Sequence, residues 1–349
     1  MPLRLHCPPA PNVAPMRHLP IACLALVVLG AETLPGQVLR VADLNTRQIT
    51  ALDRAKTVVL LQGGMLEEHG PYLPSFTDGI LSARLTDALA EGISRQLPDW
   101  TVLRFPPISV GASGSNEIGG QFVFPGTYTV RPSVLRALFM DLATDLGEQG
   151  FRWIMVVHVH GSPLHIDAID EAGDYFHDTY RGTMVNLWGL LPVLAGWGSV
   201  LGTLPDSIKR EDGVSLHAGL DEHSMMLYLD STLVASDYRS APTVAGATYD
   251  SSFAVARQPG WPGYLGAPRL ASAALGQAIW EGFSTATIRT AVEILRGADP
   301  SKYQRYMTFL RQSPLYRQWI AAAESRDALR AEQQGAWHKR RAARPASPR

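Results

Sequence analysis

Cysteine is nearly absent from this chain of 349 residues, which contains two, Cys7 and Cys23. Both lie in an N-terminal stretch that we expect to be removed, so the mature chain would have no cysteine. This excludes disulfide bonds, thiolate metal sites and a cysteine nucleophile. The absence of free thiols also agrees with export into an oxidising compartment.

A long hydrophobic run is also lacking. The apolar run at residues 19–29 has eleven residues and is too short to span a bilayer. Arg17 precedes this run and small residues follow it, which is the layout of a signal peptide. We predict a signal peptide over residues 1–36, with Met16 as a possible true start. The protein would then be exported to the periplasm or the extracellular space, with no stable membrane insertion after cleavage.

An excess of charge of either sign is absent as well, since the formal net charge is −1. No overall field therefore attracts nucleic acid or an anionic membrane, and we expect no nucleic-acid partner. A basic segment does close the chain. We predict that residues 326–349 form a basic, disordered tail, because they contain Pro, Ser and Ala beside their Lys and Arg.

The remaining composition, 46% hydrophobic and 18% charged, is typical of a globular protein. β-Branched apolar runs alternate with segments that carry apolar residues at helical spacing. This alternation predicts an α/β fold of three layers, α/β/α, with a mostly parallel central sheet, in a single domain over residues 37–325. The expected strands cover residues 57–62, 100–105, 151–157 and 183–188, and the expected helices cover 80–93, 132–148, 222–229 and 269–290.

A loop rich in metal-binding side chains follows the strand at residues 57–62. Glu67 and His69 lie at alternate positions, and two prolines stiffen the return of the chain to Asp78. Imidazole nitrogen with carboxylate oxygen suits zinc or manganese, and a carboxylate can bridge two ions. An ordinary charged surface loop is the alternative for such a triplet taken alone.

Two later segments carry similar chemistry. His158 and His160 follow the strand at 151–157, and alternation predicts that both emerge on one side of the backbone. Further on, His217 precedes a helix and Glu222 falls in its first turn. Taken singly, a histidine there can be a satisfied polar residue, and the glutamate can be a helix cap. The glycine-rich stretch at 109–126 predicts an ordered loop over a site.

These pieces, in this order, resemble the creatininase family of metal-dependent amidohydrolases over roughly residues 42–290. The family carries S-T-E-Q-H-G-P-H-L-P with T-D nearby, then F-P-G-T, N-G-H-G-G-N, H-A-G-E-x-E-T-S and G-D-P-x-x-A-T-A. The corresponding segments here are 65–74 with Thr77 and Asp78, 124–127, 158–163, 217–224 and 266–273.

The resemblance implies two divalent metal ions, zinc or manganese with iron also possible, and a homo-oligomer. It makes Glu67, His69, Asp78, His160 and Glu222 metal ligands, with Asp78 bridging. His217 and Glu222 are the catalytic acid/base candidates. We expect His158, Ser162 and Phe124 to contact the substrate, a small-molecule amide. The implied reaction is hydrolysis of a C–N bond of a small cyclic or linear amide by metal-activated hydroxide.

Three departures from the family pattern leave other functions open. Ser162 stands where creatininase itself has a glutamate, and Pro163 and Leu220 replace an asparagine and a glutamate of the motifs. One alternative is therefore a secreted binding protein that keeps the fold without turnover. Another is a peptidase-like relative that acts on a modified peptide end.

Overall fold

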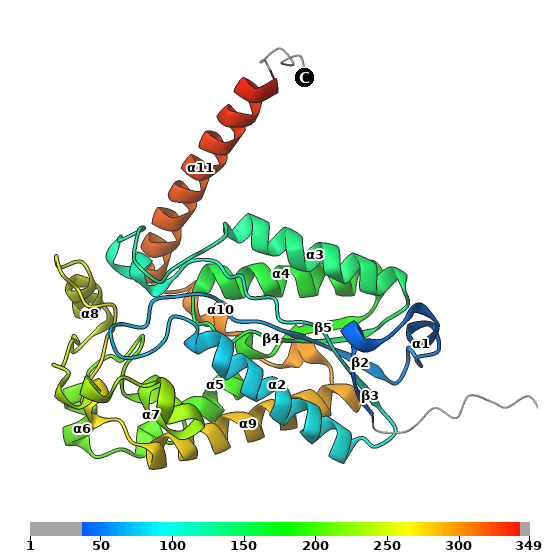
Figure 1. The fold of residues 1–349 in the computed structure, drawn as a ribbon, viewed down its shortest axis with the longest axis horizontal. Coiled ribbons are helices and arrows are strands. Elements are labelled where there is room, and N and C mark those ends of the chain that lie inside the picture. The colour runs from blue at the N-terminus through cyan, green and yellow to red at the C-terminus, as the bar shows by residue number, and fades with distance from the viewer. Residues whose placement is uncertain (1–36, 343–349) are drawn as a thin grey trace, which may run out of the picture. The chain divides into compact units, whose positions relative to one another are not determined.

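The computed structural model describes residues 37–342, which fall within one compact unit (Figure 1). The predicted signal peptide over residues 1–36 lies outside the described residues, as do the last seven residues of the predicted tail, 343–349. Within the described part, no helix combines the length and the apolar composition needed to cross a membrane.

Five parallel strands form the sheet, in the order β1-β3-β2-β4-β5. The central strand β2 is buried along its whole length, as expected for its sequence TVVLLQ. The predicted mostly parallel α/β fold is confirmed. The strands are β1 Val38–Arg40, β2 Thr57–Gln62, β3 Thr101–Arg104, β4 Trp153–Val157 and β5 Thr183–Asn186.

Two hydrophobic cores lie on opposite faces of this sheet. Val58 and Leu60 of β2 belong to one core, with the helices α2 and α9, whereas Val59 and Leu61 belong to the other, with α3 and α4. Figure 1 shows these two pairs of helices on opposite sides of the strands. The predicted three layers are therefore present. The longer helices are α2 Thr77–Gln96, α3 Pro132–Glu148, α4 Pro163–Tyr180, α7 Leu220–Asp230, α9 Ala273–Leu295 and α11 Pro314–Ala342.

Shorter helices complete the chain, and three of them, α5, α8 and α10, contribute to the functional site. Their bounds are α1 Thr46–Thr50, α5 Leu191–Gly198, α6 Asp206–Asp212, α8 Tyr249–Ala256 and α10 Tyr306–Leu310.

The C-terminal segment differs from its prediction. Residues 326–342 belong to the helix α11, so the expectation of a disordered tail from residue 326 is wrong as far as Ala342. Ala, Glu, Gln and Arg are strong helix formers and dominate this segment. Lys339, Arg340 and Arg341 fall in the last turn, where positive charge interacts favourably with the helix dipole.

A buried carboxyl group lies away from the predicted site, on α4. Asp170 is 6% exposed and lines a cavity of about 490 Å³ beside β5. Burial raises the pKa of Asp170 to about 7, although Arg305 acts to lower it. From about pH 4 to pH 7, the unfolded chain therefore ionises this group while the folded chain keeps it protonated. Its contribution to stability is present at low pH and is lost as the pH rises through 7.

Replacing Asp170 with asparagine, which cannot ionise, should remove this loss. The free energy of unfolding of Asp170→Asn, relative to that of the unaltered protein, should rise between pH 4 and pH 8. The limit is roughly 4 kcal/mol, from about three pKa units at 1.36 kcal/mol each. Urea unfolding at several pH values measures this difference, and Asp206→Asn, at an exposed ion pair with Lys209, is the control. Parallel stability curves for Asp170→Asn and the unaltered protein would contradict the assignment.

Candidate metal centre

The loop between β2 and α2, together with the first turn of α2, places three buried ligand candidates close together. Glu67, His69 and Asp78 are each at most 2% exposed. The Glu67 N–H donates to the carbonyl oxygen of Ser75 at 2.8 Å, which closes the loop on itself. Asp78 lies in the first turn of α2, where the helix dipole favours a carboxylate. Both the turn and the helix therefore direct carboxylates to the end of the sheet.

Two more candidates come from the ends of other elements. His160 follows β4, and its Nδ1 lies 3.0 Å from Glu67 Oε2 and 3.0 Å from Asp78 Oδ2. Glu222 lies in the first turn of α7, and its Oε1 is 4.0 Å from His69 Nε2. The structure thus brings together all five residues predicted as ligands, from three distant segments. Their role as ligands stays a prediction.

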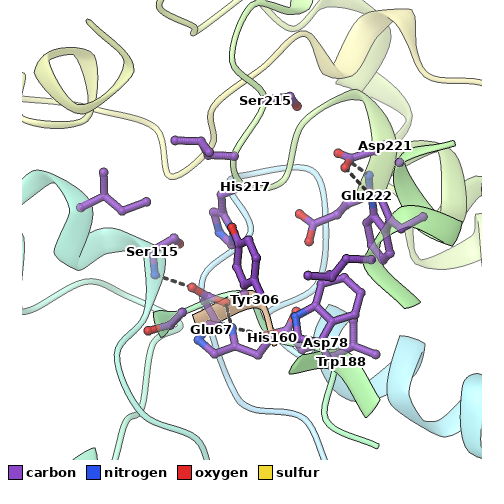
Figure 2. Close-up of a pocket in the computed structure, with 18 of the residues that line it drawn as sticks. Glu67, Asp78, Ser115, His160, Trp188, Ser215, His217, Asp221, Glu222 and Tyr306 are labelled. Atoms are coloured by element: carbon purple, nitrogen blue, oxygen red, sulfur yellow. Dashed lines mark hydrogen bonds and ion pairs between the residues drawn. The ribbon is translucent and has the colours of Figure 1, made fainter. Parts of the chain in front are cut away.

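The five predicted ligands make up two of the three candidate metal-binding groups among the described residues, and these two share one member; the third joins Glu67 and His69 to His217. Glu67, Asp78 and His160 make one group, and within it their candidate ligand atoms lie within 4.8 Å of one another. A second group that meets the same limit consists of His69, Asp78 and Glu222. Asp78 is common to both, as a bridging carboxylate would be. Figure 2 shows Glu67, Asp78, His160 and Glu222 around one cavity.

Both histidine rings are oriented for coordination by hydrogen bonds to backbone carbonyl oxygens. His160 Nε2 donates to Ser113 O at 3.0 Å, and His69 Nδ1 donates to Glu67 O at 3.1 Å. The other nitrogen of each ring therefore faces the carboxylates. His69 Nε2 is buried without a hydrogen-bond partner among the described residues, 3.4 Å from Asp78 Oδ1. This donor set and this unpartnered nitrogen fit a pair of divalent ions such as zinc or manganese.

Histidine side chains beside the carboxylates favour the charged form of the cluster and so partly balance it. Burial alone would raise the pKa of Glu67, but His160 and His217 outweigh it and hold that pKa well below the ordinary value. Burial would lower the pKa of His160, yet Glu67 and Asp78 hold it well above its ordinary value. Bound cations would take over this balancing role from the protons.

His217, one of the two predicted acid/base residues, lies beside the ligand groups. Its ring centroid is 4.4 Å from that of His69, and its Nε2 donates to Glu68 O at 2.5 Å. Burial would lower the pKa of His217, but Glu67 and Glu68 raise it well above the ordinary value. Burial raises the pKa of Glu222, the other acid/base candidate, to about 7 in spite of His69 and His217. A proton donor therefore lies next to the ligand groups.

A cavity of about 440 Å³ opens above the ligand groups. Of the three residues predicted to contact substrate, the structure places Ser162 in its wall. The remaining wall residues are mostly apolar and include side chains of α5, α8, α10 and α11. Its aromatic residues are Trp188, Trp197, Tyr249, Phe253, Tyr306 and Tyr316.

The other two predicted substrate contacts lie elsewhere. His158 does not line the cavity: its ring packs edge-on against Phe139 at 5.3 Å, and a Cβ on Gly63 would lie 1.4 Å from its Nε2. β4 ends at Val157, so the alternation of side chains along a strand does not extend to His158 and His160. Phe124 is also outside the wall and packs against Trp261, with 5.5 Å between ring centroids.

Comparison with known proteins identifies the family. The family described as creatinine amidohydrolase matches residues 42–291. The chain belongs to the creatininase family. Among curated relatives of this creatininase-family chain, the mycofactocin precursor peptide peptidases of Mycolicibacterium smegmatis and Mycobacterium ulcerans are each 27% identical, over 197 and 208 residues. These matches cover 56% and 58% of this chain, and 67% and 70% of the relatives.

Solved creatininase structures share the fold. A creatinine amidohydrolase structure is 22% identical with a TM-score of 0.54, covering 73% of this chain and 97% of the other. A manganese creatininase is also 22% identical with a TM-score of 0.54, covering 74% of this chain and 99% of the other. A Zn–Zn creatininase variant is 23% identical with a TM-score of 0.53, over 73% and 98%.

Several residues of this creatininase-family site were not identified from the sequence. Glu68 is 3% exposed, accepts from Ser115 Oγ at 3.0 Å, and holds His217 through its carbonyl oxygen. Ser115 N–H also donates to Glu67 Oε1. Glu68 lies between two predicted ligands, Glu67 and His69, and this position in the motif could have identified it as a site residue. The aromatic wall has no such local pattern.

Replacing Asp78, the carboxylate shared by both groups, should lower the metal content more than replacing a ligand that belongs to one group. We expect metal content per subunit to fall from about two ions to none in Asp78→Asn, and to about one in His160→Ala, because Asp78 belongs to both groups. Elemental analysis of the dialysed proteins measures this. Asp87→Asn, on the same helix but paired with Arg104 at 2.7 Å, should keep the full content. Full occupancy in Asp78→Asn would exclude it as the shared ligand.

Proposed function

We propose that this creatininase-family chain is a metal-dependent hydrolase that cleaves an amide C–N bond with the help of two divalent ions, zinc or manganese. The observation that carries the proposal is the pair of ligand groups, buried except for the partly exposed Glu222, that share Asp78 at one end of a cavity. Buried carboxylates and imidazoles at such spacing are costly without cations. A site of this kind is suited to hydrolysis.

Each residue of the site has a distinct task in this proposal. Glu67 and His160 would hold one ion, His69 and Glu222 the other, and Asp78 both. When bound, such ions activate a water molecule and polarise the carbonyl group of the substrate. His217 Nε2 is fixed on Glu68 O, so a protonated ring retains a second N–H at Nδ1 that can be given to the leaving nitrogen.

Two classes of substrate are compatible with this chemistry. Small cyclic or linear amides correspond to the description of the family. The modified end of a peptide corresponds to the peptidase relatives. The cavity favours the second class, because 440 Å³ with several aromatic side chains in its wall exceeds the needs of a small polar ring. A binding protein without turnover remains an outcome of the test below.

The activity should depend on metal and should distinguish these substrates. Chelation of the mature protein should abolish hydrolysis, and zinc or manganese should restore it. Small lactams, linear amides and short peptides with an apolar terminal residue make up the panel, and released amine is the measurement. Hydrolysis that survives complete metal removal would contradict the mechanism. Metal uptake with tight peptide binding but no released amine would establish the binding protein instead.

The aromatic wall provides a test of substrate class. Tyr249 lines the cavity and is 47% exposed, so Tyr249→Ala removes a contact surface without leaving a hole in the core. If the substrate is a peptide with an apolar end, KM should rise about three- to tenfold with kcat little changed, as expected for one lost aromatic contact. Tyr228→Ala, exposed but outside the cavity wall, is the control. An unchanged KM for every peptide would favour the small amides.

We also propose that the protein is exported and forms a homo-oligomer. Residues 1–36 have the layout of a signal peptide. Sequencing the N-terminus of the protein recovered outside the cytoplasm would show cleavage near residue 36, and light scattering would give the subunit number. An intact N-terminus on protein recovered only from the cytoplasm would overturn export, and a single-subunit mass would overturn the oligomer.

A further inference from the structure

The helix α11 lies outside the segment matched by the family, yet it contacts the glycine loop, residues 109–126, beside the metal centre. Arg326 makes this contact. Its Nη1 donates to Glu117 Oε1 at 2.8 Å, and its Nη2 donates to Phe122 O at 2.5 Å. The guanidinium also stacks over the ring of Phe122, 4.7 Å from its centroid. Arg326 is therefore fixed to the loop by three different interactions.

Glu117 links Arg326 to Ser113, which lies nearer the metal centre. It is 6% exposed, and burial raises the pKa of its carboxyl group, against the lowering effects of Ser113 and Arg326. One carboxylate oxygen accepts from Arg326, and the other, Oε2, accepts from Ser113 Oγ at 2.7 Å. A buried carboxylate whose cation is removed must take up a proton or move towards water. Either change would disturb its bond to Ser113.

Ser113 in turn positions a predicted metal ligand. Its backbone has φ of +60°, a conformation that residues other than glycine rarely adopt without support from their surroundings. Its carbonyl oxygen accepts from His160 Nε2 at 3.0 Å, which turns His160 Nδ1 towards Glu67 and Asp78. Hydrogen bonds of this kind, behind a metal ligand, contribute strongly to metal affinity.

We propose that Arg326 of α11 is a positioning residue for the metal centre, which acts through Glu117 and Ser113 on the orientation of His160. The proposal rests on the proposed two-metal site. It assigns a role in metal binding to a helix that follows the family segment. The same contacts would also be present if α11 only stabilised the fold, so the test needs a readout that fold stability alone does not change.

The experiment measures metal binding by the full-length, metal-free protein. Zn²⁺ affinity is obtained by competition with a chromogenic chelator, and the visible spectrum of the Co²⁺-loaded protein reports the ligand geometry. Arg326→Gln should weaken the binding of one Zn²⁺ about ten- to a hundredfold and alter the Co²⁺ spectrum. Arg326→Lys should restore part of the affinity, because it keeps the charge but not the paired hydrogen bonds. Thermal unfolding of each metal-free variant shows whether it is folded.

Arg330→Gln is the matched control. Arg330 lies one turn further along α11. Its Nη1 is 3.9 Å from Asp327 Oδ1 and 3.4 Å from Thr129 Oγ1. The variant Arg330→Gln should bind Zn²⁺ as the unaltered protein does. The double variant Arg326→Gln with Glu117→Gln tests whether the effect of Arg326 on metal binding depends on Glu117. If Arg326 acts through Glu117, the two changes together should weaken binding no more than the stronger single change.

The outcomes separate this proposal from the proposed function. Zn²⁺ affinity and a Co²⁺ spectrum unchanged in Arg326→Gln would overturn the positioning role, whatever happens to thermal stability, and would leave the hydrolase proposal standing. Equal weakening in Arg330→Gln would also overturn it. Metal binding by the unaltered protein without any hydrolysis would overturn only the proposed reaction. An unaltered protein that binds neither metal would overturn both.

Discussion

The burial of several carboxylates around Asp78 is the constraint on which the rest of this structure depends. Glu67, Glu68 and Asp78 are each at most 3% exposed. Such a cluster is expensive unless positive charge compensates it, and the raised pKa values of His160 and His217 favour protonated rings that would supply such charge. The arrangement is poorly suited to stability alone. It is well suited to holding cations whose charge replaces that of the protons.

The parallel sheet makes this concentration of charge possible. The segments after β2 and β4 emerge at the same edge, where ligand sites of α/β sheets usually lie. The first turns of α2 and α7 add Asp78 and Glu222, so helix dipoles help to stabilise the negative charge there. Non-glycine residues with positive φ, Ser113 and Ala218, lie next to this site. Backbone strain of this kind persists only where the surrounding structure enforces it.

Local patterns in the sequence predicted those residues of the site that are close together in the chain. Glu67 and His69 lie in the loop after a strand with an unmistakable apolar pattern, and Asp78 follows within eleven residues in the first turn of α2, so their convergence could be foreseen. The helix α4 was missed although Pro163 at its first position and apolar residues at helical spacing, such as Leu164, Ala168 and Ala172, mark it. The strand β1 has three residues, too few to show a period, and is recognisable only by its pairing with β3.

Long-range contacts could not be predicted in this way. Arg326 and Glu117 are 209 positions apart, and nothing near either residue indicates the other. The aromatic wall of the cavity is likewise assembled from Trp188 and from residues of α5, α8, α10 and α11, each unremarkable alone. His158 illustrates the limit of a local rule, since the alternation of side chains ends with the strand at Val157. Packing against Phe139 and Gly63 then decides where its ring lies.

The central claim is that two cations bind on either side of the Asp78 carboxylate. Anomalous X-ray diffraction from crystals soaked with manganese or zinc tests it most directly. The account predicts two anomalous peaks in contact with Asp78, one also against Glu67 and His160 and the other against His69 and Glu222. A single peak, or peaks that do not touch Asp78, would contradict it.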